Sequence, residues 1–224
     1  MSNSMKSALF GAIVLMAIIF NSPCLASKSG NLEYWQAQSV SHSLSDTYKI
    51  SIEQEFRVGR QCGSNYLHNV NVELRRSGIT EWLDIGLAFK KEYEKDSSGK
   101  FREEDRPHLN FYFKGKLSDL DLSNRFRIEY RDHEIKNNVY RLRNKLGLKL
   151  PYELTPLKLQ PYIADEVFFN LNSDNFNQNR LYSGFSFKPF GNMVFSFYYM
   201  YKKSKSSLGW IDTNVIGTQL KFLF

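Results

Sequence analysis

The last residues of the chain, 214–224, read NVIGTQLKFLF and decide the fold. Successive side chains of a strand point to opposite faces. One face of this segment therefore carries the apolar side chains of Ile216, Leu220, Phe222 and Phe224. The other face carries Val215, Gly217, Gln219 and Lys221. A soluble protein would rarely expose such a face on its last element, whereas a closed β-barrel in lipid needs it as its outer wall.

The same two-residue period runs back to residue 31, interrupted by turn residues. One predicted strand, for example, places Tyr66, Val70, Val72 and Leu74 on its apolar face. With the weaker segment 34–44 there are about eleven candidate strands. Bacterial single-chain barrels have an even number, with both termini on the periplasmic side. We therefore predict an all-β, antiparallel transmembrane β-barrel of about 10–12 strands: ten if segment 34–44 does not cross, twelve if two strands have been merged.

The connections support this topology. With a periplasmic carboxyl terminus, the connections predicted to be long all fall outside the cell, at residues 94–106, 170–178 and 204–212. The largest is the charged stretch 92–107, EYEKDSSGKFREEDRP, which we expect to be a solvated loop. The connections predicted to be short all fall in the periplasm, at residues 45–47, 77–80, 118–121, 151–156 and 189–192. This asymmetry is typical of outer-membrane barrels, and the aromatic last residue also resembles theirs.

The start of the chain has the features of a secretory signal. An apolar run, ALFGAIVLMAIIF at residues 8–20, follows Lys6 and precedes the small residues Cys24 and Ala26. We expect cleavage after Ala26, so that residues 1–26 are a signal peptide and 27–224 form the barrel in the outer membrane of a Gram-negative bacterium. The alternative, a lipoprotein signal with Cys24 lipidated, is disfavoured by Pro23. Cleavage leaves only Cys62, as a loop thiol or an intermolecular bridge.

Composition excludes two classes of protein. No second long apolar run follows, and the mean hydropathy is −0.44, so a helical membrane protein is excluded. The net charge is +7, but Lys and Arg occur at strand spacing along the whole chain and not as a patch, so we expect no nucleic-acid partner. The expected partners are outer-membrane lipid and small anionic solutes.

In a membrane barrel the apolar face of each strand meets lipid. The alternative is a soluble barrel or sandwich with the same residues turned inward. Asp165 and Asn144 are polar residues on the lipid-facing parity. A bulge near Pro161 could turn Asp165 inward, while the alternation offers no account of Asn144.

The opposite, lumen-facing parity is strongly ionic. The candidate lumen-lining residues are Glu53, Glu55, Arg57, Glu73, Arg75, Arg125, Arg127, Glu129, Arg131, Arg141, Arg143, Lys145 and Glu166, together with Lys114, Lys116 and Lys149. Because basic residues outnumber acidic ones, an open lumen would favour anions. The leading hypothesis is a narrow, porin-like pore for small solutes. In the alternative, Arg–Glu pairs fill the bore and leave a structural or lipid-binding barrel.

Catalysis and metal binding find less support. Asp132, His133 and Glu134 lie at the outer end of a predicted strand and are the best local candidates for a rim hydrolase, but no nucleophile can be assigned beside them. We therefore name no catalytic residues. The four histidines lie on separate segments without ligand spacing, so no metal site and no cofactor are expected.

The order of several motifs resembles a bacterial family catalogued as domain of unknown function 2490. The motifs are EQEFR at 53–57, RFRIEYR at 125–131, YRLRNKLGLKL at 140–150, PYIADEVFFNL at 161–171 and NQNRLYSGFSFK at 177–188. The likeness extends from near Trp35 to the end of the chain. It implies an outer-membrane β-barrel without an assigned reaction, and it supplies no catalytic residues.

Overall fold

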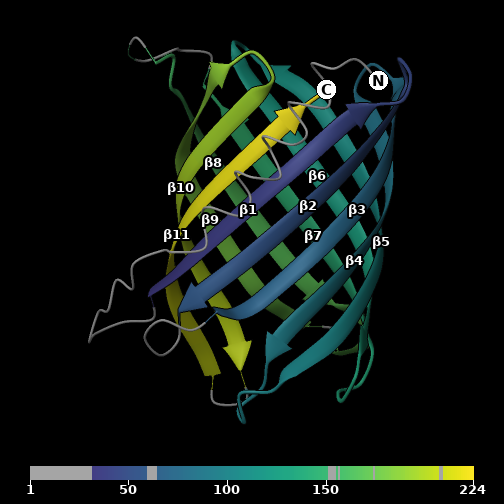
Figure 1. The fold of residues 1–224 in the computed structure, drawn as a ribbon, viewed down its shortest axis with the longest axis vertical. Coiled ribbons are helices and arrows are strands. Elements are labelled where there is room, and N and C mark those ends of the chain that lie inside the picture. Colours follow the sequence, from purple (N-terminus) through teal and green to yellow (C-terminus); the bar gives the residue numbers. More distant parts are fainter. Residues whose placement is uncertain (1–31, 60–64, 151–154, 156, 174, 207–208) are drawn as a thin grey trace, which may run out of the picture.

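In the computed structural model the chain forms one closed β-barrel (Figure 1). The structure describes residues 32–59, 65–150, 155, 157–173, 175–206 and 209–224. The strands are β1 (Leu32–Ser43), β2 (Tyr48–Gly59), β3 (Asn65–Thr80), β4 (Leu83–Lys95), β5 (Phe101–Leu117), β6 (Leu120–His133), β7 (Val139–Lys149), β8 (Gln160–Asn170), β9 (Asn175–Phe190), β10 (Met193–Ser206) and β11 (Gly209–Leu223), with a 3₁₀ turn, η1 (Leu171–Ser173), after β8. No helix among these residues has the length and apolarity to cross a membrane.

The barrel is closed by a parallel pair, β1 with β11, while every other neighbouring pair is antiparallel. Leu32 pairs with Asn214 and Ser41 with Leu223. Beyond this register, Ser43 N donates to Phe224 O at 2.9 Å, and Phe224 N donates to Ser41 O at 2.9 Å. The terminal strand is therefore fixed along its length.

The predicted all-β barrel of about 10–12 strands is confirmed, but the expectation of an even number, ten or twelve, is wrong. Segment 34–44 forms most of β1, a strand of 12 residues, and the barrel has eleven strands. An even number is required only where the first and last strands also pair antiparallel. Parallel pairing removes that requirement, because the start of β1 then lies at the opposite end of the barrel from the end of β11.

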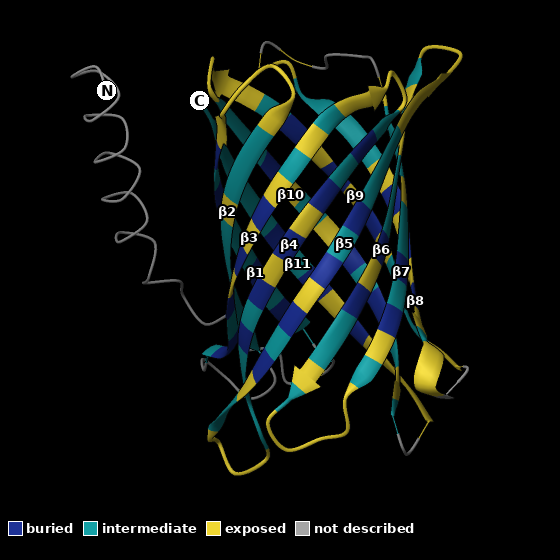
Figure 2. Ribbon diagram, turned by 90° about the vertical axis from the view of Figure 1, so that its right-hand side faces the viewer, coloured by how far each residue is buried: buried dark blue, intermediate teal, exposed yellow. Residues whose placement is uncertain are grey.

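The faces of the strands are sorted as predicted, with charge inside and apolar side chains outside. Glu129 and Glu166 are each only 1% exposed, whereas Ile163 is 54% and Leu87 66% exposed. Figure 2 shows buried and exposed residues alternating along single strands. A soluble barrel would bury its apolar side chains, so the structure excludes that alternative and has the outer wall of a lipid-facing barrel.

The connections alternate between the two ends of the barrel as predicted, but their lengths do not all match. At the end where β11 finishes, the β3–β4, β5–β6 and β9–β10 turns have two residues each. The β7–β8 connection, 150–159, lies at the same end and is longer than predicted. The predicted turn 77–80 is instead an irregular end of β3, with a register shift between Arg76 and Thr80.

The predicted loop 92–107 is wrong, because β4 and β5 continue through it and leave only the turn 96–100. Asp96 organises this turn: its Oδ1 accepts hydrogen bonds from Ser98 N at 2.9 Å and Lys100 N at 3.1 Å. The Ser98 hydroxyl, with Arg102, holds the pKa of Asp96 well below its usual value. Gly99 has φ 82° and supplies the left-handed residue. The Ser and Gly residues of this stretch thus form the tight turn 96–100, and most of its charged residues belong to the two flanking strands.

The two polar exceptions stay on the outer face, where each has a partner. Asp165 is exposed and accepts a hydrogen bond from Asn179 Nδ2 at 2.5 Å, so the proposed inward turn near Pro161 is wrong. Asn144 exchanges two hydrogen bonds of 3.0 Å with Asn124 on the neighbouring strand. Side-chain pairing across strands therefore reduces the cost of both polar groups.

Tyr66 is a third correction. It was predicted on the apolar outer face, but it is 5% exposed and its hydroxyl donates to Glu33 Oε2 at 2.6 Å inside the barrel. The cause is a register shift: Arg57 pairs with Leu67 but Val58 pairs with Asn65. The extra residue in β3 breaks the two-residue period, so Tyr66 and Leu67 are both buried.

The parallel closure can be tested with engineered cysteines. Ala37 and Gln219 are register partners and both line the interior. Neighbouring strands lie about 4.8 Å apart, within the span of about 4.4–6.8 Å that a disulfide bridges. With the two native cysteines replaced by serine, Ala37→Cys with Gln219→Cys should form an oxidised species of altered gel mobility that reductant reverses.

The matched control is Ala37→Cys with Thr213→Cys. Thr213 also faces inward on β11 but lies six residues from the register partner, about 20 Å along the strand. This pair should not cross-link. A twelfth strand between β1 and β11 would prevent the bridge in both variants and contradict the eleven-strand closure.

Candidate functional site in the barrel interior

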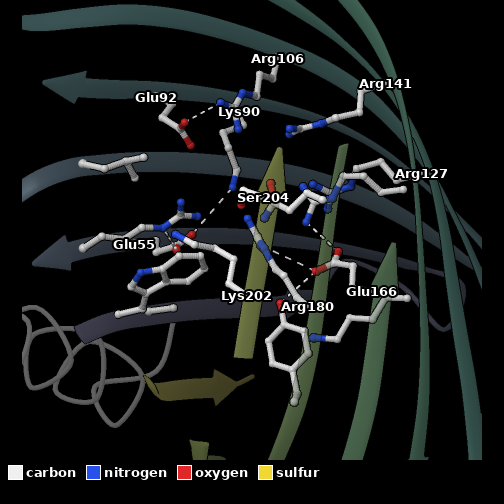
Figure 3. A pocket seen from close by; sticks show the side chains of 18 of the residues that line it. Glu55, Lys90, Glu92, Arg106, Arg127, Arg141, Glu166, Arg180, Lys202 and Ser204 are labelled. Carbon is white, nitrogen blue, oxygen red and sulfur yellow. Dashed lines mark hydrogen bonds and ion pairs between the residues drawn. The ribbon is translucent and has the colours of Figure 1, made fainter. Parts of the chain in front are cut away.

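The interior contains a cavity of about 350 Å³ whose wall includes residues from all eleven strands. Its described lining contains twelve Lys and Arg side chains but five Glu side chains. Figure 3 shows Arg127, Arg180 and Lys202 reaching into it from different strands. Because alternate residues of a strand face opposite sides, the strands that place apolar residues outside also place many cationic residues inside.

Most predicted lumen residues meet at this cavity. Ten of the thirteen principal candidates line it: Glu53, Glu55, Arg57, Arg125, Arg127, Arg131, Arg141, Arg143, Lys145 and Glu166. Glu129 is buried against the arginines of the wall, while Glu73 binds Arg75, Asn110 and Tyr112 beside it. Lys114 and Lys116 are exposed near the end of β5, where Lys114 Nζ lies 2.5 Å from Asp84 Oδ2.

Glu129 on β6 is one hub of the ionic network. It receives Arg141 from the adjacent strand, Arg143 Nη1 at 3.3 Å and Arg127 Nη1 at 3.8 Å. Arg127 also donates from Nε to Asn110 Oδ1 at 2.7 Å. One buried carboxylate therefore serves three guanidinium groups.

Glu166 on β8 is the second hub. Its Oε1 lies 2.7 Å from Arg143 Nη2 and 2.8 Å from Arg125 Nη2. Its Oε2 accepts the Tyr182 hydroxyl at 2.9 Å and lies 3.7 Å from Arg180 Nη1. Arg143 reaches both hubs and so connects the neighbouring strands β6, β7 and β8.

A further ion-pair group lies toward the β4–β5 turn, and sequence reasoning missed its central members. Arg106 Nη2 lies 2.5 Å from Glu92 Oε1, and Arg106 Nε lies 2.5 Å from Glu104 Oε1. Glu104 also binds Arg131 Nε at 2.5 Å. Glu92, Glu104 and Arg106 are absent from the predicted lumen residues because the sequence predicts a loop over 92–107, although alternate residues of this stretch carry charges of both signs.

A Trp35 cluster occupies the wall between β1, β2, β9 and β10. The Arg57 guanidinium lies 3.6 Å from the centroid of the Trp35 ring, and the Arg180 guanidinium 4.9 Å from it. Lys202 Nζ lies 3.1 Å from Glu33 Oε2, which also accepts Trp35 Nε1 at 2.8 Å. Arg180 and Lys202 were not predicted, although each lies on the lumen parity of its strand, next to Leu181 or Tyr201.

Of the rim residues considered for catalysis, His133 and Glu134 line one pocket near the β4–β5 turn, whereas Asp132 does not line it. The carboxylate nearest His133 is Glu104 of β5, with Nδ1 3.1 Å from Oε2, and not Asp132 or Glu134. Glu134 accepts Glu103 N at 3.1 Å and Arg102 Nη1 at 3.2 Å, and these contacts lower its pKa. Asp132 is exposed. No group of three or more His, Cys, Asp and Glu side chains within the described ranges is placed to hold a metal ion.

Removing the hub carboxylate Glu129 should lower the stability of the folded barrel. Glu129→Ala leaves Arg141 without its carboxylate and Arg143 with one of two. Breaking a buried ion pair from one side typically costs about 3–5 kcal/mol. We expect the urea unfolding midpoint of the barrel refolded in phospholipid vesicles to fall sharply, as measured by tryptophan fluorescence and heat-dependent gel mobility.

Glu103→Ala is the control, because Glu103 pairs with Lys91 at 2.7 Å where both side chains are exposed. Exposed pairs contribute little, so this variant should unfold like the parent chain. Equal midpoints for both variants would show that Glu129 is not needed to hold the interior together.

Comparisons with known proteins agree with this architecture. The structure of LpxR from Salmonella typhimurium is similar, with a TM-score of 0.53 and 11% sequence identity over 83% of this chain and 87% of that chain. At this identity the likeness concerns the fold. A comparison with curated proteins finds no match. The family model described as protein of unknown function (DUF2490) matches residues 32–212. Because the match spans all or part of every strand from β1 to β11, the chain belongs to the DUF2490 family.

Proposed function

We propose that this protein is an outer-membrane barrel, exported by a cleaved signal peptide, that forms a narrow passage for small anions. The inverted distribution of side chains supports insertion into lipid, because exposed Ile, Leu, Val and Phe surround a polar interior. The signal segment 1–26 and Cys62 lie outside the described residues. The proposed location therefore depends on the sequence pattern together with the barrel.

The lining of the cavity is the observation on which the anion preference depends. Twelve cationic side chains face five carboxylates there, so the field favours negative ions. Low-dielectric walls strengthen such a field, and rings of Arg and Lys are the usual lining of anion pores. A cation would encounter a barrier along most of this wall.

The same network limits the width of the passage. Arg106, Glu92, Glu104 and Arg131 form contacts of 2.5 Å toward the β4–β5 turn, which leave little free space between them. This observation favours the second candidate, a structural or lipid-binding barrel whose lumen is filled by ion pairs. The two functions differ in one measurable property, which is conductance.

Planar bilayer recording distinguishes them. In a tenfold KCl gradient, the purified barrel should conduct. Its reversal potential should have the sign of the chloride equilibrium potential, which indicates selectivity for the anion. Lys145→Glu adds an acidic group to the cavity wall and should move that potential toward zero. Gel mobility before and after heating verifies that each variant is folded.

Lys203→Glu is the matched control, since Lys203 is exposed on the outer parity of β10 and does not line the cavity. It should leave the reversal potential unchanged. An absence of conductance would support the filled barrel, and a preference for potassium would contradict the anion passage.

A further inference from the structure

One part of the interior holds more positive charge than its own carboxylates neutralise. We call it the oxyanion cluster and define it by Arg125, Arg127, Arg141, Arg143, Lys145 and Arg180 with the carboxylates Glu129 and Glu166. Its six cations all line the cavity. Five guanidinium groups and one ammonium group share two carboxylates, so the cluster has an excess of four positive charges.

No other carboxylate among the described residues lies within 4.0 Å of these six cations. Within 4.0 Å, Arg125 and Arg180 have only Glu166, and Arg127 and Arg141 have only Glu129. Lys145 has no carboxylate partner in that range and instead places Nζ 3.7 Å from the centroid of the Tyr182 ring. Buried charges of one sign are costly unless a counter-charge joins them. The cluster therefore needs anions from outside the chain.

Aromatic rings hold these cations in place beside the cavity. The Arg180 guanidinium lies 4.6 Å, and that of Arg143 4.7 Å, from the centroid of the Phe168 ring, which is fully buried. In such a contact the flat face of the guanidinium group packs on the ring. The N–H donors at the edge of the guanidinium group remain available to other acceptors. Figure 3 shows Arg180 and Arg127 pointing toward the same space as Glu166.

We propose that the oxyanion cluster binds a phosphate-class anion carrying at least two negative charges, an inference that rests on the proposed anion passage and names its ligand. A compact oxyanion offers several acceptors to converging guanidinium forks, which a halide does not. Its multiple charge also offsets more of the excess than a monovalent ion would. The cavity of about 350 Å³ lies at the lower end of the range for small-ligand sites, about 300–1,000 Å³.

Two sources present this chemistry: free phosphate in the periplasm, and the phosphate of a lipid headgroup that enters from the mouth of the barrel. Titration calorimetry on the full-length mature chain in dodecyl maltoside, at low ionic strength, separates them. Inorganic phosphate tests the first source, and dihexanoyl phosphatidic acid tests the second. Sodium chloride at matched ionic strength is the comparison anion.

Lys145→Gln is the decisive variant, because it removes one excess charge without separating an ion pair. We expect the parent barrel to bind one or more equivalents of phosphate, and the variant to bind about tenfold more weakly. In phosphate-free buffer the variant should unfold at the same urea concentration as the parent or a higher one. Lys203→Gln should change neither property, since Lys203 faces outward.

The outcomes are distinguishable. Saturable binding of phosphate or of the phosphatidic acid, weakened in Lys145→Gln, supports the site and identifies its source. No saturable binding of either probe, or equal affinity in Lys145→Gln and the parent, overturns it. A less stable Lys145→Gln in phosphate-free buffer would assign Lys145 a purely structural role and also overturn it. Calorimetry does not require ion flow, so a barrel that binds phosphate but carries no current would refute the passage and retain the site.

Discussion

The pairing of β1 with β11 is the constraint on which the rest of the structure depends. A sheet in lipid cannot leave a row of backbone N–H and C=O groups unpaired, because no water is there to bind them. Closing the sheet removes both edges at once, and the parallel register from Leu32 to Ser41 does so with an odd number of strands. Closure also creates an inside, where the charged side chains of the inner parity need counter-charges.

The interior supplies part of that counter-charge by sharing carboxylates. Glu129 and Glu166 each bind several guanidinium groups, and Arg143 joins the two hubs. Such a network stiffens the barrel but leaves positive charge in excess at the cavity. The same residues therefore have a structural role and an electrostatic one: the ion pairs hold the strands together, and the surplus cations give the cavity its preference for anions.

Predictions from the two-residue period were wrong in two situations. In one, a bulge shifted the side chains to the other face; in the other, a strand was so rich in charged residues that it was predicted as a loop. Tyr66 was assigned to the wrong face because a bulge in β3 adds one residue, and a single-residue shift moves a side chain from one face to the other. Glu92, Glu104 and Arg106 lie in a stretch that the sequence predicts as a loop. Charged residues dominate this stretch, so it lacks the apolar face that marks the other strands. The Asp165 side chain remains on the outer face, where it accepts a hydrogen bond from Asn179.

Alternation along each strand is a local property, so the sequence alone determined the all-β class, the lipid-facing and lumen-facing sides, and most of the ionic residues of the cavity wall. Which strands meet at closure depends on contacts between residues about 180 positions apart, such as Leu32 and Asn214, and only the tertiary structure decided it. The period indicates about eleven candidate strands, but only the parallel closure allows an odd number of them. The sharing of two carboxylates among five arginines leaves no periodic signal, because it depends on side chains that the neighbouring strands β6 to β9 bring together.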